Sequence, residues 1–350
     1  MPIIRVMENE VKQSIADSKE FPKTLQEAIV FFANPDNALN FMIEIRWPDG
    51  VITCPRCGSD RHTFISTRRT WQCKDKACKK MFTVKLGTVM EDSPIGLDKW
   101  LAAMWMICNA KNGVSSYEIH RAIGITQKSA WFLLHRIRLA MQQGSFEKMS
   151  GQIETDESFI GGKAKNMHKE RRENLIKGRG AVGKAIVMGI LERGDKEAGK
   201  ASQIKAAVIA DRSAETLQSQ VRENVEVGSQ VMTDEWTGYE GLSGDYVHSV
   251  INHSVKYAQD GITTNHVENF WTLFKRCIKG TYVSVEADHL QAYLDEEMFR
   301  FNERKGKDKH RFVKTAFGIE GKRLTYKQLT ATEDGLGRRG NMPAFKKDAE

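Results

Sequence analysis

The segment Gly151-Gln-Ile-Glu-Thr-Asp-Glu157 ends in the triplet Thr-Asp-Glu, and the segment Gln230-Val-Met-Thr-Asp-Glu235 ends in the same triplet. Each triplet follows a short β-prone run, so the pattern predicts an Asp-Glu pair at the end of a strand. A third carboxylate, Glu268, lies on a predicted helix with strong apolar periodicity. Two strand-end aspartates and a helix-borne glutamate can hold a pair of divalent metal ions, as phosphoryl transfer on DNA requires.

Strand geometry limits which carboxylates can share a site. Neighbouring side chains on a strand point to opposite faces, so only one residue of each Asp-Glu pair can face a common centre. Parity alone does not choose between Asp156 and Glu157, or between Asp234 and Glu235. Both residues of each pair therefore remain candidate metal ligands on the basis of the pattern.

The helix predicted at 265–278 is more informative. Its apolar residues form one stripe at about 100° per residue, and Glu268 falls on the opposite face beside Lys275 and Arg276. A metal ligand next to a DNA backbone fits this face. A surface glutamate paired with lysines is the alternative reading, and in isolation it is the more common case.

The region around these carboxylates alternates strands and helices. We expect strands near 152–159, 184–192, 204–210, 229–233 and 246–251, with helices at 214–223 and 265–278. Three strands, a helix, two strands and a final helix is the order of an RNase H-like α/β domain. The basic loop 161–184 within it is either a DNA clamp or a solvated insertion.

Four of the six cysteines form a compact cluster. Cys54, Cys57, Cys73 and Cys78 have the spacing C-x2-C-x15-C-x4-C, which is typical of a tetrahedral zinc ribbon. Disulfides are the alternative, but they are uncommon inside cells. His62 is a weaker candidate ligand. Basic residues around the cluster, with Arg68 and Arg69 among them, favour contact with phosphates over a merely solvated surface.

The helices after the ribbon suggest a helix-turn-helix. Ser115 and Glu118 have capping-box spacing, Gly124 ends that helix, and Thr126 can cap the next. In the second helix the side chains that we expect to face DNA are Gln127, Lys128, His135 and Arg138. An ordinary helical hairpin is the alternative.

Composition sets the broad class. The chain has 350 residues and a formal charge of +8, which suits a polyanionic partner. It has no apolar run of membrane-spanning length, and its first residues are too polar for a secretory signal. We expect a soluble, cytoplasmic protein.

These patterns divide the chain into five segments. We expect a helical segment at 1–50, a zinc ribbon at 51–90 and a helix-turn-helix region at 91–143. An RNase H-like domain follows at 152–304, and a basic, partly disordered tail at 305–350.

Several stretches together carry a family likeness. They are Arg46-Trp-Pro-Asp-Gly-Val51, Cys54-Pro-Arg-Cys-Gly58, Leu86-Gly-Thr-Val89, Thr155-Asp-Glu-Ser-Phe-Ile-Gly-Gly-Lys163, Thr233-Asp-Glu-Trp-Thr-Gly-Tyr239, Asn265-His-Val-Glu-Asn-Phe-Trp271, Lys275-Arg276, Gly280-Thr-Tyr282 and Phe299-Arg-Phe-Asn-Glu-Arg304. In this combination the chain resembles the DDE transposases of prokaryotic insertion sequences, in the ISXO-like group with an N-terminal zinc ribbon.

The resemblance implies a catalytic triad and a DNA substrate. Asp156, Asp234 and Glu268 would hold two Mg²⁺, or Mn²⁺, while Asn265 and Asn269 remain lesser candidates for the third position. The four cysteines would hold a structural Zn²⁺. We expect DNA contacts from Arg68, Arg69, Gln127, Lys128, Lys275 and Arg276.

The implied function is a transposase that binds the terminal inverted repeats of its element, cleaves strands and joins them to target DNA. We expect homo-oligomers in the DNA complex, action at the nucleoid, and no membrane partner or nucleotide cofactor. The alternatives are a non-catalytic DNA-binding regulator and a metal-dependent nuclease that cuts without joining.

Overall fold

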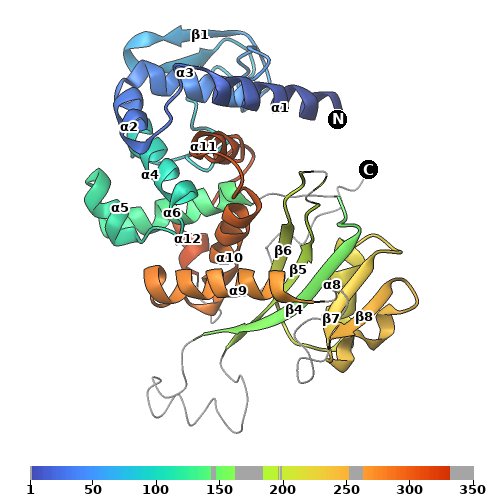
Figure 1. Ribbon diagram of the computed structural model, residues 1–350. Helices are drawn as coiled ribbons and strands as arrows, with labels where there is room; N and C mark the ends of the chain where they lie inside the picture. The colour runs from blue at the N-terminus through green and yellow to red at the C-terminus, as the bar shows by residue number, and fades with distance from the viewer. Residues whose placement is uncertain are drawn as a thin grey trace.

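A five-stranded mixed sheet carries both Thr-Asp-Glu triplets (Figure 1). The computed structural model describes residues 2–142, 147–161, 184–195, 197, 199–251 and 263–331. The strands are β4 (Gln152–Ile160), β5 (Ala185–Glu192), β6 (Gln203–Ile209), β7 (Gln230–Asp234) and β8 (Val247–Ile251). They match the five predicted strands closely, whereas most of the basic loop 161–184 lies outside the described residues.

The sheet has the order β6-β5-β4-β7-β8. β5 runs antiparallel to both β4 and β6, whereas β4, β7 and β8 are parallel to one another. The connection from β6 to β7 contains α8 (Ala214–Asn224), and that from β7 to β8 contains the 3-10 turn η3 (Thr237–Leu242). This arrangement brings the ends of β4 and β7, and therefore both triplets, next to each other.

Helices cover both faces of the sheet. On one face lie α9 (Asn265–Cys277) and α10 (Ala287–Asn302), joined by the π-helical turn η4 (Ile278–Tyr282), and α8 lies on the other. β5 shows why: Val187 and Leu191 pack with α9 and α10, while Met188 and Ile190 pack with α8. Each large apolar side chain buried in this way contributes roughly 1.5–3 kcal/mol.

A glycine allows α9 to lie close to the sheet. Gly189 of β5 pairs with Asp156 across the strands. A Cβ atom at this position would come within 2.8 Å of the Trp271 ring and 3.1 Å of Val267. Any larger residue would therefore push α9 away from the strand that carries Asp156.

The outer edge of β6 is covered by α10. Three side chains of α10 accept hydrogen bonds from β6 backbone N–H groups: Gln291 from Val208, Asn302 from Ile204, and the Met298 sulfur from Ala206. These bonds satisfy groups that an open edge strand would leave for another chain. The stretch Phe299-Arg-Phe-Asn302 thus has a structural role at this edge.

The N-terminal part forms a second lobe above the sheet in Figure 1. Its helices are α1 (Pro2–Asp17), α2 (Leu25–Ala33), α3 (Pro35–Arg46), α4 (Leu97–Asn109), α5 (Ser116–Ile123) and α6 (Gln127–Met141). A small antiparallel sheet lies between α3 and α4, with strands β1 (His62–Ile65), β2 (Thr70–Cys73) and β3 (Met81–Phe82) and the short turn η1 (Ser66–Arg68).

One hydrophobic core joins these N-terminal elements, although the sequence suggested three successive segments. Phe32, Phe41, Trp71 and Trp105 all belong to it. Phe312 from the distant C-terminal region packs among them, 4.9 Å from the Trp105 ring between centroids. Within the described residues, each helix is too short or too polar to cross a bilayer.

Part of the expected tail is helical. Residues after 305 form α11 (Asp308–Phe317) and α12 (Tyr326–Thr330). Phe312, Val313 and Ala316 are buried against α1, α3, α4 and α6. Their i, i+1, i+4 spacing makes an apolar stripe on α11, which the surrounding lysines and arginines obscured in the composition. Residues 332–350 lie outside the described part.

Candidate active site and zinc centre

The sheet register brings the two aspartates to the same face. Glu154 of β4 pairs with Met232 of β7 in the parallel ladder, so Asp156 and Asp234, two residues further along each strand, are also in step. Both lie on the face that α9 covers, because the residues of opposite parity, Ile153 and Val231, pack in the α8-side core. The pairing thus resolves a question that strand parity alone left open.

The third carboxylate approaches the same point from α9. Glu268 is exposed in the first turn of α9, and its charge acts on Asp156. Its carboxylate accepts a hydrogen bond of 3.0 Å from the Thr264 hydroxyl. Asn265 and Asn269 are exposed on the same helix. The charges of Asp234 and Glu268 both act on Asp156, so the three carboxylates share one neighbourhood.

Electrostatics at this point favour a cation. Burial raises the pKa of Asp156 to about 7, and the negative charges of Glu157, Asp234 and Glu268 add to the rise. The Trp271 indole N–H donates to Asp156 Oδ2 at 3.1 Å and fixes the orientation of the carboxylate. Carboxylate oxygens are the ligands that Mg²⁺ and Mn²⁺ prefer. The three carboxylates are therefore candidate ligands for divalent metal ions.

A fully buried glutamate fixes the start of α9. Glu154 Oε2 accepts the backbone N–H groups of His266 and Val267 at 2.9 and 3.2 Å, and its Oε1 lies 2.6 Å from His266 Nδ1. Arg193 donates to the same carboxylate at 2.6 Å and to the Thr263 carbonyl at 2.8 Å. Glu154 thus caps, from a strand, a helix that lacks a side-chain cap of its own. Glu268 directly follows Val267 and so lies within the anchored first turn of α9.

The two remaining carboxylates of the triplets have other surroundings. Glu157 points to the opposite face, where it forms an ion pair with Arg212 at 2.7 Å and accepts a hydrogen bond from the Tyr239 hydroxyl. Glu235 is exposed after the end of β7. Glu157 therefore has a structural partner of its own, which the sequence analysis did not foresee.

Four thiols meet in the N-terminal lobe. The sulfur atoms of Cys54 and Cys78 are 3.9 Å apart, those of Cys57 and Cys73 are 3.7 Å apart, and all four lie within 4.8 Å of one another. Tetrahedral zinc with Zn–S bonds of about 2.3 Å requires sulfurs about 3.8 Å apart. The thiols are free rather than paired in disulfides, and they fit a zinc ion.

Two turns in the ribbon orient these thiols toward one another. Gly58 has a positive φ of 73° and donates its N–H to the Cys54 carbonyl at 2.8 Å, which closes the first loop. Asp75 organises the second loop by accepting the N–H of Ala77 at 2.9 Å. The extended C-x4-C spacing is therefore compatible with the same geometry. His62 lies on β1 outside the thiol cluster.

The expected caps of α5 and α6 are present. Ser115 and Glu118 form a capping box, Gly124 adopts a left-handed conformation, and Thr126 accepts the N–H of Ser129. These local signals were predicted correctly.

Two residues expected to face DNA are buried instead. Arg138 is 1 % exposed and forms an ion pair with Glu296 at 2.7 Å. His135 is 2 % exposed, and burial, the Arg138 charge and His289 lower its pKa to about 2. The prediction was wrong for both residues because α10 covers this side of α6, and nothing local in the sequence shows that contact.

The other basic and polar candidates remain accessible to different degrees. Lys128 is exposed with its ammonium 4.7 Å from the Tyr326 ring, and Gln127 donates to the Ser116 hydroxyl at 2.9 Å. Arg68 is exposed, whereas Arg69 pairs with Asp36 at 2.9 Å. At the end of α9, Lys275 is half-buried and Arg276 is exposed.

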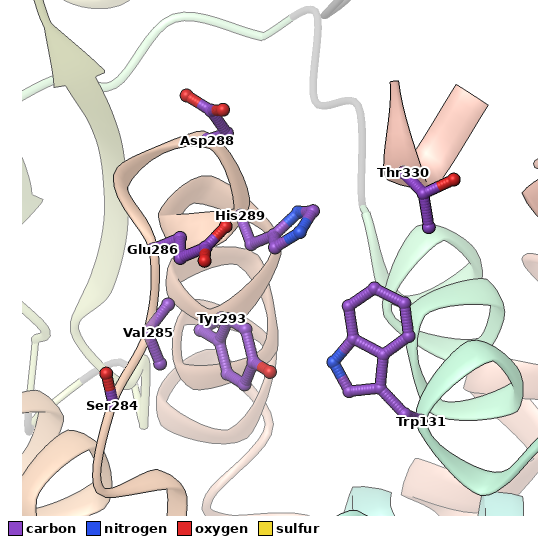
Figure 2. Close-up of a pocket in the computed structure, with 8 residues that line it drawn as sticks. All are labelled: Trp131, Ser284, Val285, Glu286, Asp288, His289, Tyr293 and Thr330. Atoms are coloured by element: carbon purple, nitrogen blue, oxygen red, sulfur yellow. The ribbon is translucent and has the colours of Figure 1, made fainter. Parts of the chain in front are cut away.

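A pocket of about 410 Å³ lies where α6 meets the start of α10 (Figure 2). Trp131 lies on one side, and His289 and Tyr293 lie on the other. Glu286 and Asp288 also line it, and their negative charge does not suit a phosphate. The candidate metal ligands do not contribute to its walls.

Comparisons with known proteins match both parts of the chain. Residues 148–302 match the family of the ISXO2-like transposase domain, and residues 34–81 match the family of the transposase zinc-ribbon domain. The chain belongs to the ISXO2-like transposases. The match at 34–81 contains all four clustered cysteines, and that at 148–302 contains all three candidate metal ligands.

Two relatives extend this assignment. The transposase is 25% identical over 282 residues to the "uncharacterized protein in transposable element ISH50" of Halobacterium salinarum, covering 75% of this chain and 89% of the relative. It is 31% identical over 101 residues to an "uncharacterized transposase-like protein" of Haemophilus influenzae, covering 29% of this chain and 81% of the relative.

Sequence reasoning missed Glu154, Arg193 and Trp271 as supports of the transposase's carboxylates. Glu154 directly precedes the first triplet, and an acidic residue in an otherwise apolar strand is a signal in itself, since buried carboxylates require partners. Arg193 has no comparable signal, because it follows its strand as many surface arginines do.

Proposed function

We propose that this transposase binds the terminal inverted repeats of its element, cleaves DNA strands at the element ends and joins them to target DNA. The observation that carries the proposal is the convergence of Asp156, Asp234 and Glu268 on one face of the sheet, with the pKa of Asp156 raised to about 7. The sheet order β6-β5-β4-β7-β8, with one antiparallel and one parallel half, supports an RNase H-like fold for the catalytic part.

Two divalent ions, Mg²⁺ or Mn²⁺, suit these carboxylates. Asp156, Asp234 and Glu268 would hold these ions. Such ions activate an attacking oxygen and stabilise a leaving one in displacements at phosphorus. The chain itself orients the ligands: the Trp271 N–H holds Asp156, and Glu154 holds the turn of α9 that carries Glu268.

The N-terminal lobe is the proposed DNA-binding part. A zinc ion on the four cysteines would fix the ribbon and the surrounding basic side chains, and α5 with α6 would act as a helix-turn-helix. Because α10 covers the second half of α6, only its first turn, with Gln127 and Lys128, remains for base contacts. Arg68, Arg69, Lys275 and Arg276 would contact phosphates. Two element ends must be paired, so we propose a homo-oligomer on DNA, acting at the nucleoid.

Substitution of the carboxylates tests the proposal. Asp156→Asn, Asp234→Asn and Glu268→Gln should each abolish Mg²⁺-dependent cleavage and strand transfer, because each removes a charge that a hard cation needs. DNA binding should persist. Glu235→Gln is the matched control, since Glu235 is exposed beyond the strand and should leave activity intact.

Three results would count against this function or for a rival. Full activity in the Glu268 variant together with loss in Asn265→Ala or Asn269→Ala would move the third ligand along α9. Metal-dependent cleavage without joining to a target plasmid would indicate a nuclease. Specific DNA binding without cleavage in the wild type would indicate a regulator.

A further inference from the structure

Trp236 is an exposed aromatic side chain that is nevertheless held in a fixed position. The residue is 41% exposed, yet its indole N–H donates to the Arg212 carbonyl at 3.2 Å, and the Arg212 guanidinium lies 4.1 Å from its ring. A Cβ atom at Gly238 would come within 2.9 Å of the indole, so the ring also packs against this glycine.

The support under the ring is itself fixed. Arg212 donates from Nε and Nη2 to the carboxylate of Glu157, at 2.8 and 2.7 Å. Glu157 is held in turn by the Tyr239 hydroxyl. The ring is therefore ordered before any ligand arrives, so binding to it costs little further side-chain entropy.

The position of the ring points to the class of ligand. The backbone N–H of Trp236 donates to Asp234 Oδ1 at 3.0 Å, so the residue lies in the turn that begins at a candidate metal ligand, two positions after it. DNA held at the carboxylates would bring the nucleotides next to the reacting phosphate to this turn. An aromatic ring backed by a guanidinium stacks with bases of any sequence, whereas bases inside a duplex already stack on one another.

We propose that Trp236 is a stacking platform for one unpaired nucleobase of the DNA strand adjacent to the phosphate that reacts. This inference rests on the proposed function, since it takes the carboxylates as the place of reaction. Bases next to a nick or a cut end unpair at the lowest cost, so the platform favours DNA that has been opened at the element end. Arg212 acts here through the ring and is a positioning residue.

Binding to matched oligonucleotides tests the platform. The probes are a mixed-sequence duplex with a short single-stranded overhang of thymidines, the same duplex with abasic sites in the overhang, and the blunt duplex. Fluorescence anisotropy with Ca²⁺ measures each affinity, because Ca²⁺ takes the same oxygen ligands in looser geometry. The variants are Trp236→Ala, Trp236→Leu and Trp236→Phe, and Val250→Ser on β8 is the control, since Val250 is 52% exposed.

The wild type should prefer the thymidine overhang over the abasic overhang by roughly 5- to 150-fold, the ratio that corresponds to about 1–3 kcal/mol per stacked base. The Ala and Leu variants should lose this preference, the Phe variant should keep most of it, and the control should match the wild type. Leu keeps apolar volume against Gly238 and lacks a ring, so it tests stacking even if the Ala variant does not fold.

Other outcomes overturn the platform. Equal affinity of the wild type for both overhangs, or a preference retained by the Leu variant, rules out stacking on this ring. If the Trp236 variants changed their oligomeric state in ultracentrifugation but kept the base preference, Trp236 would be shown to contact a second protein chain. The proposed function is tested separately, by whether the Asp156→Asn variant still cleaves DNA. That result does not change the base preference measured here.

Discussion

Replacement of Glu154 by Gln is the sharpest test of how the fold holds the carboxylates. One oxygen of Glu154 accepts two N–H groups of α9, and the other accepts from Arg193 and lies beside His266. Gln keeps the size of the side chain but replaces one carboxylate oxygen by an NH₂ group. The N–H groups that donated to that oxygen would then face another hydrogen-bond donor. The substitution also removes the negative charge of Glu154 that faces Arg193, whose side chain is 13% exposed.

The expected loss of stability follows from these contacts. Removing one partner of a buried ion pair costs about 3–5 kcal/mol, and a hydrogen bond to a charged group contributes about 1.5–3 kcal/mol. Because Gln retains one acceptor, we expect the free energy of unfolding in urea to fall by about 2–4 kcal/mol. Glu154→Ala should reach the upper end of that range or exceed it.

A second effect should appear at the metal site, although Glu154 itself is not a proposed ligand. The start of α9 becomes less well fixed, and Glu268 with it, so Mn²⁺ affinity should fall about 10–100-fold, as is usual when residues that orient ligands are lost. Mn²⁺ titration followed by electron paramagnetic resonance measures this. Asp245→Asn is the matched control: Asp245 pairs with Arg222 at an exposed position, 44% and 46% exposed respectively, where about 0–1 kcal/mol is expected.

Wild-type values of both stability and Mn²⁺ affinity in Glu154→Gln would refute the reasoning. Lower stability with unchanged Mn²⁺ affinity would show that the cap holds the fold but not the ligands. Neither result depends on the cleavage assay, so the test stands apart from the proposed function.

Four further predictions concern zinc, pH and DNA recognition. Cys73→Ser should lose the single zinc ion per chain in elemental analysis and weaken end binding, while the circular dichroism of the sheet domain persists, because Cys73 lies in the N-terminal core. Mn²⁺ affinity should fall about tenfold per pH unit below pH 7, since Asp156, with its pKa raised to about 7, then takes up a proton that competes with the metal. Replacing Gln127 and Lys128 together by Ala should reduce the ratio of specific to random DNA binding in competition assays, and an unchanged ratio would refute the role of α6. Arg68→Ala should weaken both kinds of binding and flatten their dependence on salt.

Local signals explain what could be predicted from the sequence. The boundaries of α5 and α6 follow from caps at Ser115, Gly124 and Thr126, which act within one turn of the chain. The strands follow from short apolar runs such as 185–191. The thiol cluster follows from spacing, because tight turns fix the distance between nearby cysteines.

Tertiary contacts explain what could not be predicted. The face of β4 that carries Asp156 is selected by the packing of α9 against Gly189, which lies 33 positions away in the chain. The burial of His135 depends on α10, and the order of α11 depends on a core built from the first half of the sequence. Each of these contacts joins segments whose own patterns are compatible with more than one partner.

The buried charges between the two lobes show why such contacts matter for function. Arg138 of α6 and Arg300 of α10 both pair with Glu296, and Arg300 also pairs with Glu297 at 2.5 Å. Tyr282, from the turn after α9, donates to Glu296 at 2.5 Å. Buried ion pairs of this kind add little net stability compared with apolar packing, but their bonds are directional. They therefore fix the proposed recognition helix relative to the helix that carries Glu268. Under the proposed function, DNA held by the N-terminal lobe would be presented to the carboxylates in one orientation.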